Sequence, residues 1–145
     1  HLMNNDKISI FLVDDDALYL KVLENEFLQH ADFNILTFPT GEHCIENLSQ
    51  NPDVIVLDYY LDGIYENAMN GLETLDKIKL IKPEIPVIML SAQDKIEVAI
   101  NCMHHQAFDY VVKSETAFMR LHKIISTIFQ NRKLNKELNW YMERM

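Results

Sequence analysis

Glycine, proline and cysteine are all scarce in this chain of 145 residues, which contains three glycines, four prolines and two cysteines. Because 48% of the residues are apolar and 24% are charged, the composition excludes collagen-like, low-complexity and disordered proteins and favours one domain with a sizeable core. So few cysteines, with no signal-peptide pattern, indicate that Cys44 and Cys102 are reduced thiols in a cytoplasmic protein.

Basic residues are outnumbered by acidic ones, 13 to 22, which gives a formal net charge of −9. A chain this acidic has no general electrostatic attraction for nucleic acids or anionic lipids. No apolar run approaches the length that spans a bilayer. We therefore expect this domain to bind neither nucleic acid nor membrane. Residues 1–6 are interpreted as a tag remnant and N-terminal tail, because His1-Leu2-Met3 looks like a cloning remnant.

Short β-branched runs alternate with longer runs of helical spacing. Strands are predicted over 8–13, 33–38, 53–57, 86–90 and 108–112, and helices over 17–29, 41–48, 71–81 and 94–105. A last helix, capped by Ser114, follows, and in the helix before it we expect Ile96, Ala99 and Met103 to face inward. This alternation predicts an α/β fold, a doubly wound five-stranded parallel sheet with helices on both faces.

Polar side chains follow directly after four of the predicted strands: Asp14 with Asp15, Asp58, Ser91 and Lys113. Because the carboxyl ends of parallel strands share one edge of the sheet, these side chains should converge. Clustered carboxylates repel one another and need a cation, and hard oxygen ligands favour Mg²⁺. A carboxylate beside Mg²⁺ can attack phosphorus, while Ser91 donates to the phosphoryl group and Lys113 neutralises it. Taken singly, each is an ordinary turn residue; together they indicate phosphoryl chemistry.

The ordered set resembles the receiver domain of two-component response regulators. The likeness lies in Val13-Asp14-Asp15, in Asp58 after Val-Ile-Val-Leu, in Ser91-Ala92 and in Asp109-Tyr110-Val-Val-Lys113, and it covers residues 7–130. The resemblance implies a flavodoxin-like fold of receiver type. It also implies a phosphorylation-activated signalling switch that is no enzyme beyond its own Mg²⁺-dependent phosphotransfer and slow dephosphorylation.

The resemblance also assigns roles to the residues. Asp58 would accept a phosphoryl group from a sensor histidine kinase or a phosphotransfer protein. Asp15 and Asp58 would bind Mg²⁺ directly with the main-chain carbonyl of Tyr60, and Asp14 would assist through water. Tyr110 would be the switch aromatic, which rotates inward as Ser91 moves toward the phosphate.

Two other functions stay open at this point. A pseudo-receiver would bind its partners without phosphorylation, although the full set of acids, hydroxyl and lysine speaks against it. A phosphohydrolase of the haloacid-dehalogenase type would require a second acid where Tyr60 stands.

Three features depart from the family pattern. Asp62 follows Leu61 where a proline is usual, and Ser114 replaces a proline after Lys113. Because a cis peptide bond before a residue other than proline costs about 2.5–4 kcal/mol, we expect a trans Lys113–Ser114 bond, with Lys113 reaching the site by its flexible stem. Residues 63–70 form an insertion beside the site that either shapes partner choice and shields the phosphate or is a neutral surface loop.

No glycine or proline interrupts the chain from Ala117 to Met145, so the last helix is predicted to outrun the domain. Beyond residue 130, heptad spacing relates Leu134, Leu138, Tyr141 and Met145. Residues 131–145 are therefore predicted to be a helical extension that acts as a connector to a downstream effector domain or protein, or as a homodimer contact. A frayed tail is the alternative, because a lone short helix is marginal in water.

Overall fold

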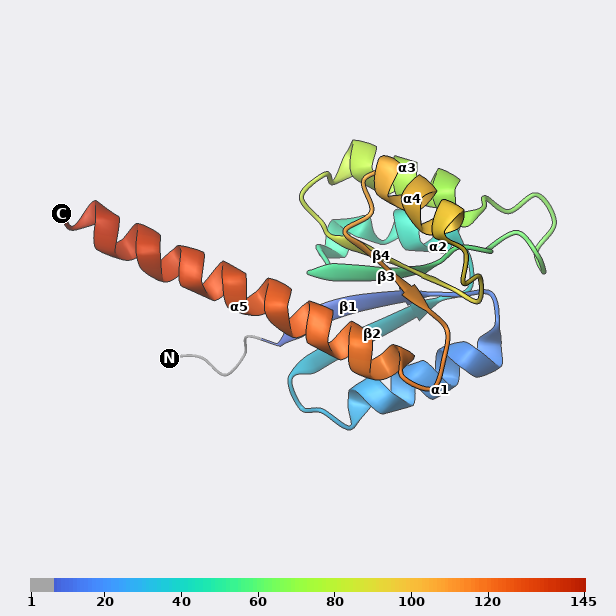
Figure 1. The fold of residues 1–145 in the computed structure, drawn as a ribbon, viewed down its shortest axis with the longest axis horizontal. Helices are drawn as coiled ribbons and strands as arrows, with labels where there is room; N and C mark the ends of the chain where they lie inside the picture. Colours follow the sequence, from blue (N-terminus) through green and yellow to red (C-terminus); the bar gives the residue numbers. More distant parts are fainter. Residues whose placement is uncertain (1–6) are drawn as a thin grey trace.

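The computed structural model describes residues 7–145, which form a parallel sheet covered by helices on both faces (Figure 1). The strands are β1 (Ile8–Val13), β2 (Phe33–Phe38), β3 (Val54–Asp58), β4 (Val87–Ser91) and β5 (Asp109–Val112). The helices are α1 (Ala17–Leu28), α2 (Gly41–Glu46), the short 3-10 helix η1 (Leu48–Gln50), α3 (Gly71–Ile81), α4 (Ile96–His104) and α5 (Ala117–Glu143). The strand order β2-β1-β3-β4-β5 confirms the predicted fold class. The tag remnant predicted over residues 1–6 lies outside the described residues.

Alternate residues of the central strands enter two separate cores, because successive side chains of a strand point to opposite faces. Ile10 and Leu12 of β1 pack on the face covered by α1 and α5, whereas Phe11 and Val13 pack on the face covered by α2, α3 and α4. Burial on both faces explains why the central strands are apolar nearly throughout. Cys44 and Cys102 are free and buried in the second core, as expected for reduced thiols.

Two local predictions were wrong. Ile96 and Met103 of α4 are 72% and 47% exposed, and the helix instead turns Val98 and Cys102 toward the core. The error arose because this short helix carries apolar residues on more than one side. Ser114 does not cap α5, since the N-cap residue is Thr116. No cis peptide bond occurs within residues 7–145, so the Lys113–Ser114 bond is trans as predicted.

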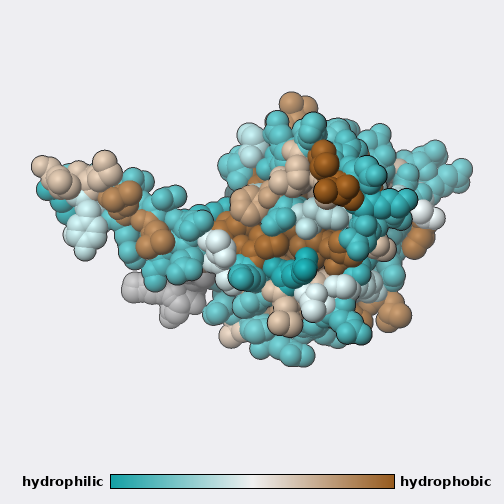
Figure 2. Space-filling view, in the orientation of Figure 1, coloured by the Kyte–Doolittle hydropathy of each residue, from teal (hydrophilic) through white to brown (hydrophobic). Residues whose placement is uncertain are grey.

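Helix α5 begins against the sheet and continues beyond it (Figure 1). Leu121, Ile125 and Ile128 are buried on the sheet, and one turn later Arg132 pairs with Asp53 at 3.2 Å. From residue 133 onward every side chain is exposed, and Figure 2 shows apolar side chains along this projecting part. Within the part of the chain described, no helix is both long and apolar enough to cross a membrane.

Candidate phosphorylation site at the carboxyl edge of the sheet

The carboxyl ends of four strands bring the predicted residues together. β1 and β3 pair with Val13 opposite Leu57, so Asp14 and Asp58 follow side by side. On the other side of β3, the main-chain N–H of Lys113 donates to the carbonyl of Ser91 at 2.7 Å. The parallel register, rather than any local motif, therefore gathers residues that lie far apart in the sequence.

Three carboxylates form a cluster at this edge. Asp14, Asp15 and Asp58 each offer an oxygen, and these atoms lie within 4.8 Å of one another. Asp14 and Asp58 are only 3% and 4% exposed. The pKa of Asp58 is raised to about 7, chiefly by burial and then by the charge of Asp14, although Lys113 and the main-chain N–H of Tyr60 oppose this rise. Burial and the charge of Asp14 also raise the pKa of Asp15.

Lys113 compensates part of this negative charge. Its Nζ lies 2.9 Å from Oδ2 of Asp14 and 3.5 Å from Oδ1 of Asp58. Burial acts to lower the pKa of Lys113, but the two carboxylates outweigh it and the pKa is raised. The lysine therefore stays charged, as the prediction for its role requires. One ammonium facing three carboxylates leaves the cluster short of positive charge.

The donor set of the cluster suits a divalent cation. Mg²⁺ takes oxygen ligands and is commonly bound by one or two carboxylates with water and phosphate oxygens in the remaining positions. Burial and then the charge of Asp14 raise the pKa values of Asp15 and Asp58, and a cation between these carboxylates would favour their ionised forms. Within residues 7–145, no other group of three or more histidine, cysteine or acidic side chains is arranged to hold a metal.

The side chains of Ser91 and Tyr110 are linked through the main chain of Gln93, a contact that the sequence did not reveal. Ser91 is fully buried at the end of β4, and its Oγ accepts a hydrogen bond from the Gln93 N–H at 3.0 Å. The hydroxyl of Tyr110, which is half-buried against the second core, donates to the Gln93 carbonyl. A movement of Ser91 can thus reach Tyr110 through one residue.

Tyr60 lies directly beyond the acid cluster, as predicted. Its main-chain N–H lowers the pKa of Asp58 by hydrogen bonding. Its ring is 48% exposed and meets the ring of Tyr59 edge to face, with centroids 4.9 Å apart. The predicted role of its carbonyl as a metal ligand stays a prediction.

Gly63, in the loop between β3 and α3, and Gly71, the first residue of α3, both contact the site. Only the spacing of these glycines in the sequence could have suggested the contacts. A Cβ on Gly71 would lie 2.5 Å from the carbonyl oxygen of Asp58, so only glycine lets α3 begin there. The main chain of Gly63 lowers the pKa of Asp15 by hydrogen bonding. Farther along this loop, the N–H of Met69 donates to Glu42 of α2 at 2.9 Å. The insertion is therefore held at both ends, by the contact of Gly63 with Asp15 of the acid cluster and by the hydrogen bond of Met69 to Glu42.

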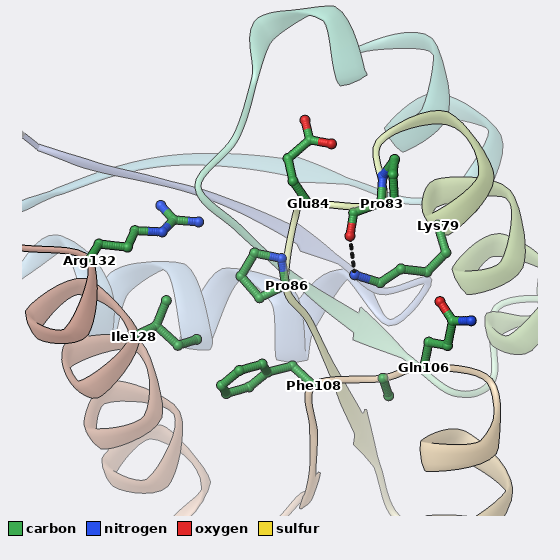
Figure 3. A pocket seen from close by; sticks show the side chains of 9 residues that line it. Lys79, Pro83, Glu84, Pro86, Gln106, Phe108, Ile128 and Arg132 are labelled. Atoms are coloured by element: carbon green, nitrogen blue, oxygen red, sulfur yellow. Dashed lines mark hydrogen bonds between the residues drawn. The ribbon is translucent and has the colours of Figure 1, made fainter. Parts of the chain in front are cut away.

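A cavity of about 470 Å³ at the opposite edge of the sheet contains none of these residues (Figure 3). It lies before β4 and β5, where Pro86 and Phe108 contribute to its wall beside Arg132 of α5. Lys79 lines it but is already engaged, since its Nζ donates to the carbonyls of Pro83 and Ile85. The charged side chain of Lys79 is therefore occupied by these two main-chain carbonyls.

Known proteins resemble this chain both in sequence and in fold. The transcriptional regulatory protein ZraR of Escherichia coli K12 is 30% identical over 111 residues, which are 77% of this chain and 24% of ZraR. The DNA-binding transcriptional regulator NtrC of the same organism is 35% identical over 105 residues, 72% of this chain and 21% of NtrC. The chain thus spans about a quarter of the length of these relatives. The BeF3-activated DrrB receiver domain superposes with a TM-score of 0.73 at 27% identity, covering 86% of this chain and 98% of that receiver-domain chain.

The family described as the response regulator receiver domain matches residues 10–126, most of the chain. This match agrees with the five-stranded parallel sheet and with the acid cluster at its carboxyl edge. The chain belongs to the receiver domains of response regulators, the phosphorylation-activated switches of two-component signal transduction.

Proposed function

We propose that Asp58 is the phosphoacceptor of this receiver domain and that Mg²⁺ binds beside it. The observation that carries the proposal is the convergence of Asp58 with Asp14, Asp15 and Lys113 at the end of the central strand β3. Mg²⁺ would be held by Asp15, Asp58 and the main-chain carbonyl of Tyr60, with Asp14 acting through water. Bound there, Mg²⁺ supplies positive charge to the carboxylates and to the phosphoryl oxygens.

The reaction is a transfer between two nucleophiles. A carboxylate oxygen of Asp58 forms a bond to phosphorus as the bond from phosphorus to the imidazole nitrogen of a phosphohistidine breaks, and the electron pair of that bond stays on the imidazole. Lys113, already 3.5 Å from Asp58, pairs with the phosphoryl oxygens. Ser91 accepts from Gln93, so its own hydroxyl proton is free to be donated to a phosphoryl oxygen.

The switch follows from the link between Ser91 and Tyr110. A hydroxyl drawn toward the phosphoryl group pulls on the Gln93 N–H, which changes the position of the carbonyl that holds Tyr110. Tyr110 then rotates inward. Phosphorylation needs to favour this second state by only a few kcal/mol.

The donor is a sensor histidine kinase or phosphotransfer protein, and the partner downstream is an effector domain or protein. ZraR and NtrC are regulators far longer than this chain, which supports an output beyond the receiver domain. Because its net charge is −9, we expect this domain not to contact nucleic acid itself, so the output would be delivered by the downstream partner. The buried free thiols support a cytoplasmic place of action. Apart from its own phosphorylation and slow dephosphorylation, the domain turns over no substrate.

Incubation with acetyl phosphate or phosphoramidate and Mg²⁺ tests the assignment. Intact mass should show one added phosphoryl group in the native protein and none in Asp58→Asn. Equal labelling of Asp58→Asn at Asp14 or Asp15 would show that Asp58 is not the acceptor. Beryllofluoride with Mg²⁺ should shift the amide NMR signals of Ser91 and Tyr110; no response in the native protein would favour a pseudo-receiver.

A further inference from the structure

Tyr19 on α1 contacts the site without belonging to the predicted set. It lies in the first turn of α1, three residues after the N-cap Asp16, and its ring is partly buried against the core between α1 and the sheet. The ammonium of Lys113 lies 4.5 Å from the centroid of this ring. Lys113 therefore touches two carboxylates, Asp14 and Asp58, and one aromatic face.

The contact has the geometry of a cation–π interaction. A lysine ammonium within about 6 Å of a ring centroid is attracted by the negative face of the ring, more strongly where water is excluded. The side chain of Lys113 is only 18% exposed, so the pair is partly shielded from water. Burial raises the pKa of Tyr19, so the ring is neutral and offers its face rather than a phenolate.

The position of the Lys113 ammonium is not fixed by the backbone alone, because the side chain is long and flexible. Its side chain has four rotatable bonds, and holding an ammonium at one point costs conformational entropy. The segment that follows, Ser114 to Thr116, is exposed. Tyr19 comes from a different element, α1, and its ring gives the ammonium a contact in addition to the two carboxylates.

We propose that Tyr19 is a positioning residue for Lys113, whose ring holds the ammonium at the Asp14–Asp58 pair in readiness for the phosphoryl group. The proposal rests on the proposed function for its kinetic readout, but the contact itself is measurable without phosphorylation. The ring performs the positioning, and the hydroxyl of Tyr19 contributes nothing to it. Tyr19 touches neither the acceptor carboxylate nor the phosphoryl group, and acts only through Lys113.

The test compares Tyr19→Leu with Tyr19→Phe, each alone and combined with Lys113→Ala. With phosphoramidate and Mg²⁺ as donor, Tyr19→Leu should slow phosphorylation of Asp58 about three- to tenfold, the range expected for a partly shielded cation–π contact. Tyr19→Phe, which keeps the ring, should restore most of the rate. In the Lys113→Ala background, measured over longer incubation, Tyr19→Leu should cause no further loss.

Two results would overturn the proposal. An equal loss from Tyr19→Leu in the presence and in the absence of Lys113 would show that Tyr19 acts through packing. A loss from Tyr19→Phe as large as that from Tyr19→Leu would assign the effect to the hydroxyl. Thermal unfolding of each variant, followed by circular dichroism, shows whether it is folded under the conditions of the assay.

The contact between Lys113 and Tyr19 can also be measured in the native protein by NMR, without any variant and without phosphorylation. The Hε protons of Lys113 should show an upfield ring-current shift in NMR spectra compared with those of an exposed lysine such as Lys136. Absence of this shift refutes the contact even if Asp58 is phosphorylated. Presence of the shift with no labelling of Asp58 would instead refute the proposed function and leave the contact standing.

Discussion

A proton and a divalent cation compete for the carboxylate of Asp58. Because burial and the charge of Asp14 raise the pKa of Asp58 to about 7, this carboxyl carries its proton over much of the acidic range. Mg²⁺ must displace that proton, so we predict that Mg²⁺ affinity falls by up to about tenfold per pH unit below pH 7 and levels off above it. Calorimetric titration of Mg²⁺ between acidic and mildly alkaline pH measures this slope.

Two variants separate the contribution of Asp58 from the general effect of charge. Asp58→Asn should weaken Mg²⁺ binding and flatten its pH dependence. Asp32→Asn, which removes an exposed acid from the turn before β2, should leave the slope as it is in the native protein. A native affinity that does not change from pH 5.5 to 7 would contradict the prediction.

The space at Gly71 allows a second prediction at this scale. The Cβ of an alanine there would lie 2.5 Å from the carbonyl oxygen of Asp58 and 2.6 Å from that of Tyr59, both of which are main-chain atoms that cannot simply rotate away. Gly71→Ala should therefore lower the free energy of unfolding by about 1–3 kcal/mol and slow phosphorylation of Asp58, because the segment after β3 must shift. Urea denaturation and the phosphorylation assay measure both effects.

Gly63→Ala provides a matched control in the same loop. Its Cβ would lie 3.6 Å from Oδ2 of Asp15, an ordinary van der Waals distance. This variant should stay close to the native protein in stability. If Gly63→Ala and Gly71→Ala are equally destabilised, the close approach at Gly71 is not the cause.

Among the elements, the insertion over residues 63–70 depends on a contact with α2. The Met69 N–H donates to the carboxylate of Glu42 at 2.9 Å. Removing an acceptor that is charged and partly buried costs about 1.5–3 kcal/mol where the donor is left unpaired. We predict that Glu42→Ala speeds amide hydrogen exchange in residues 63–70 and makes this loop more sensitive to proteolysis.

Glu46→Ala on the same helix is the control for a change of charge and helix propensity. Glu46 is exposed at the end of α2, and no hydrogen bond or ion pair joins its side chain to the described residues. Its replacement should leave exchange in the loop unchanged. Equal protection in Glu42→Ala and in the native protein would mean that the loop is held by its other contacts.

The sequence predicted well those strands that are buried on both faces of the sheet. β1, β3 and β4 are apolar nearly throughout because helices cover both faces. A polar residue of the site ends β3 and β4 and directly follows β1. The inward face of α4 could not be predicted in this way, since Ile96 and Ile100 are apolar yet 72% and 49% exposed. Periodicity gives the direction of a face only when the opposite face is polar.

The sequence allowed the residues at the strand ends to be predicted, but not the contacts that other elements make with them. Asp14, Asp58 and Lys113 follow strands, and parallel pairing alone brings strand ends together. The contacts of Tyr19 and Gly63 depend instead on where α1 and a loop of unusual length lie relative to the sheet. No spacing in the sequence encodes those distances, because they are set by tertiary packing.

For the whole molecule, the projecting part of α5 is the segment through which we expect the chain to associate. Leu134, Leu138 and Tyr141 are 55%, 57% and 64% exposed along one heptad stripe. An isolated helix of this length is marginal in water, so we propose that a second copy covers the stripe. We predict a dimer, detected by sedimentation or light scattering with and without beryllofluoride, that is lost when residues 131–145 are deleted.

Two substitutions at neighbouring positions test whether the apolar stripe itself, rather than any part of residues 131–145, forms the dimer contact. Leu138→Ser should weaken the dimer, whereas Asn139→Ser, one residue off the stripe, should leave it intact. A monomer in both states at high concentration, with a tail that proteases remove readily, would rule out association through α5. That outcome would favour the frayed tail over a contact between two copies.

The pairing of Arg132 with Asp53 makes α5 a lever with its pivot on the sheet. The helix starts four residues after Lys113 and is anchored again at Arg132, where its guanidinium also donates to the Asp53 carbonyl. About 22 Å of helix lies between Ala117 and this pivot and about 17 Å beyond it, so a tilt of about 5° moves the far end by about 1.5 Å. A displacement of the first turn of α5 beside the carboxylates is thus carried to the tip in the opposite direction and at similar size.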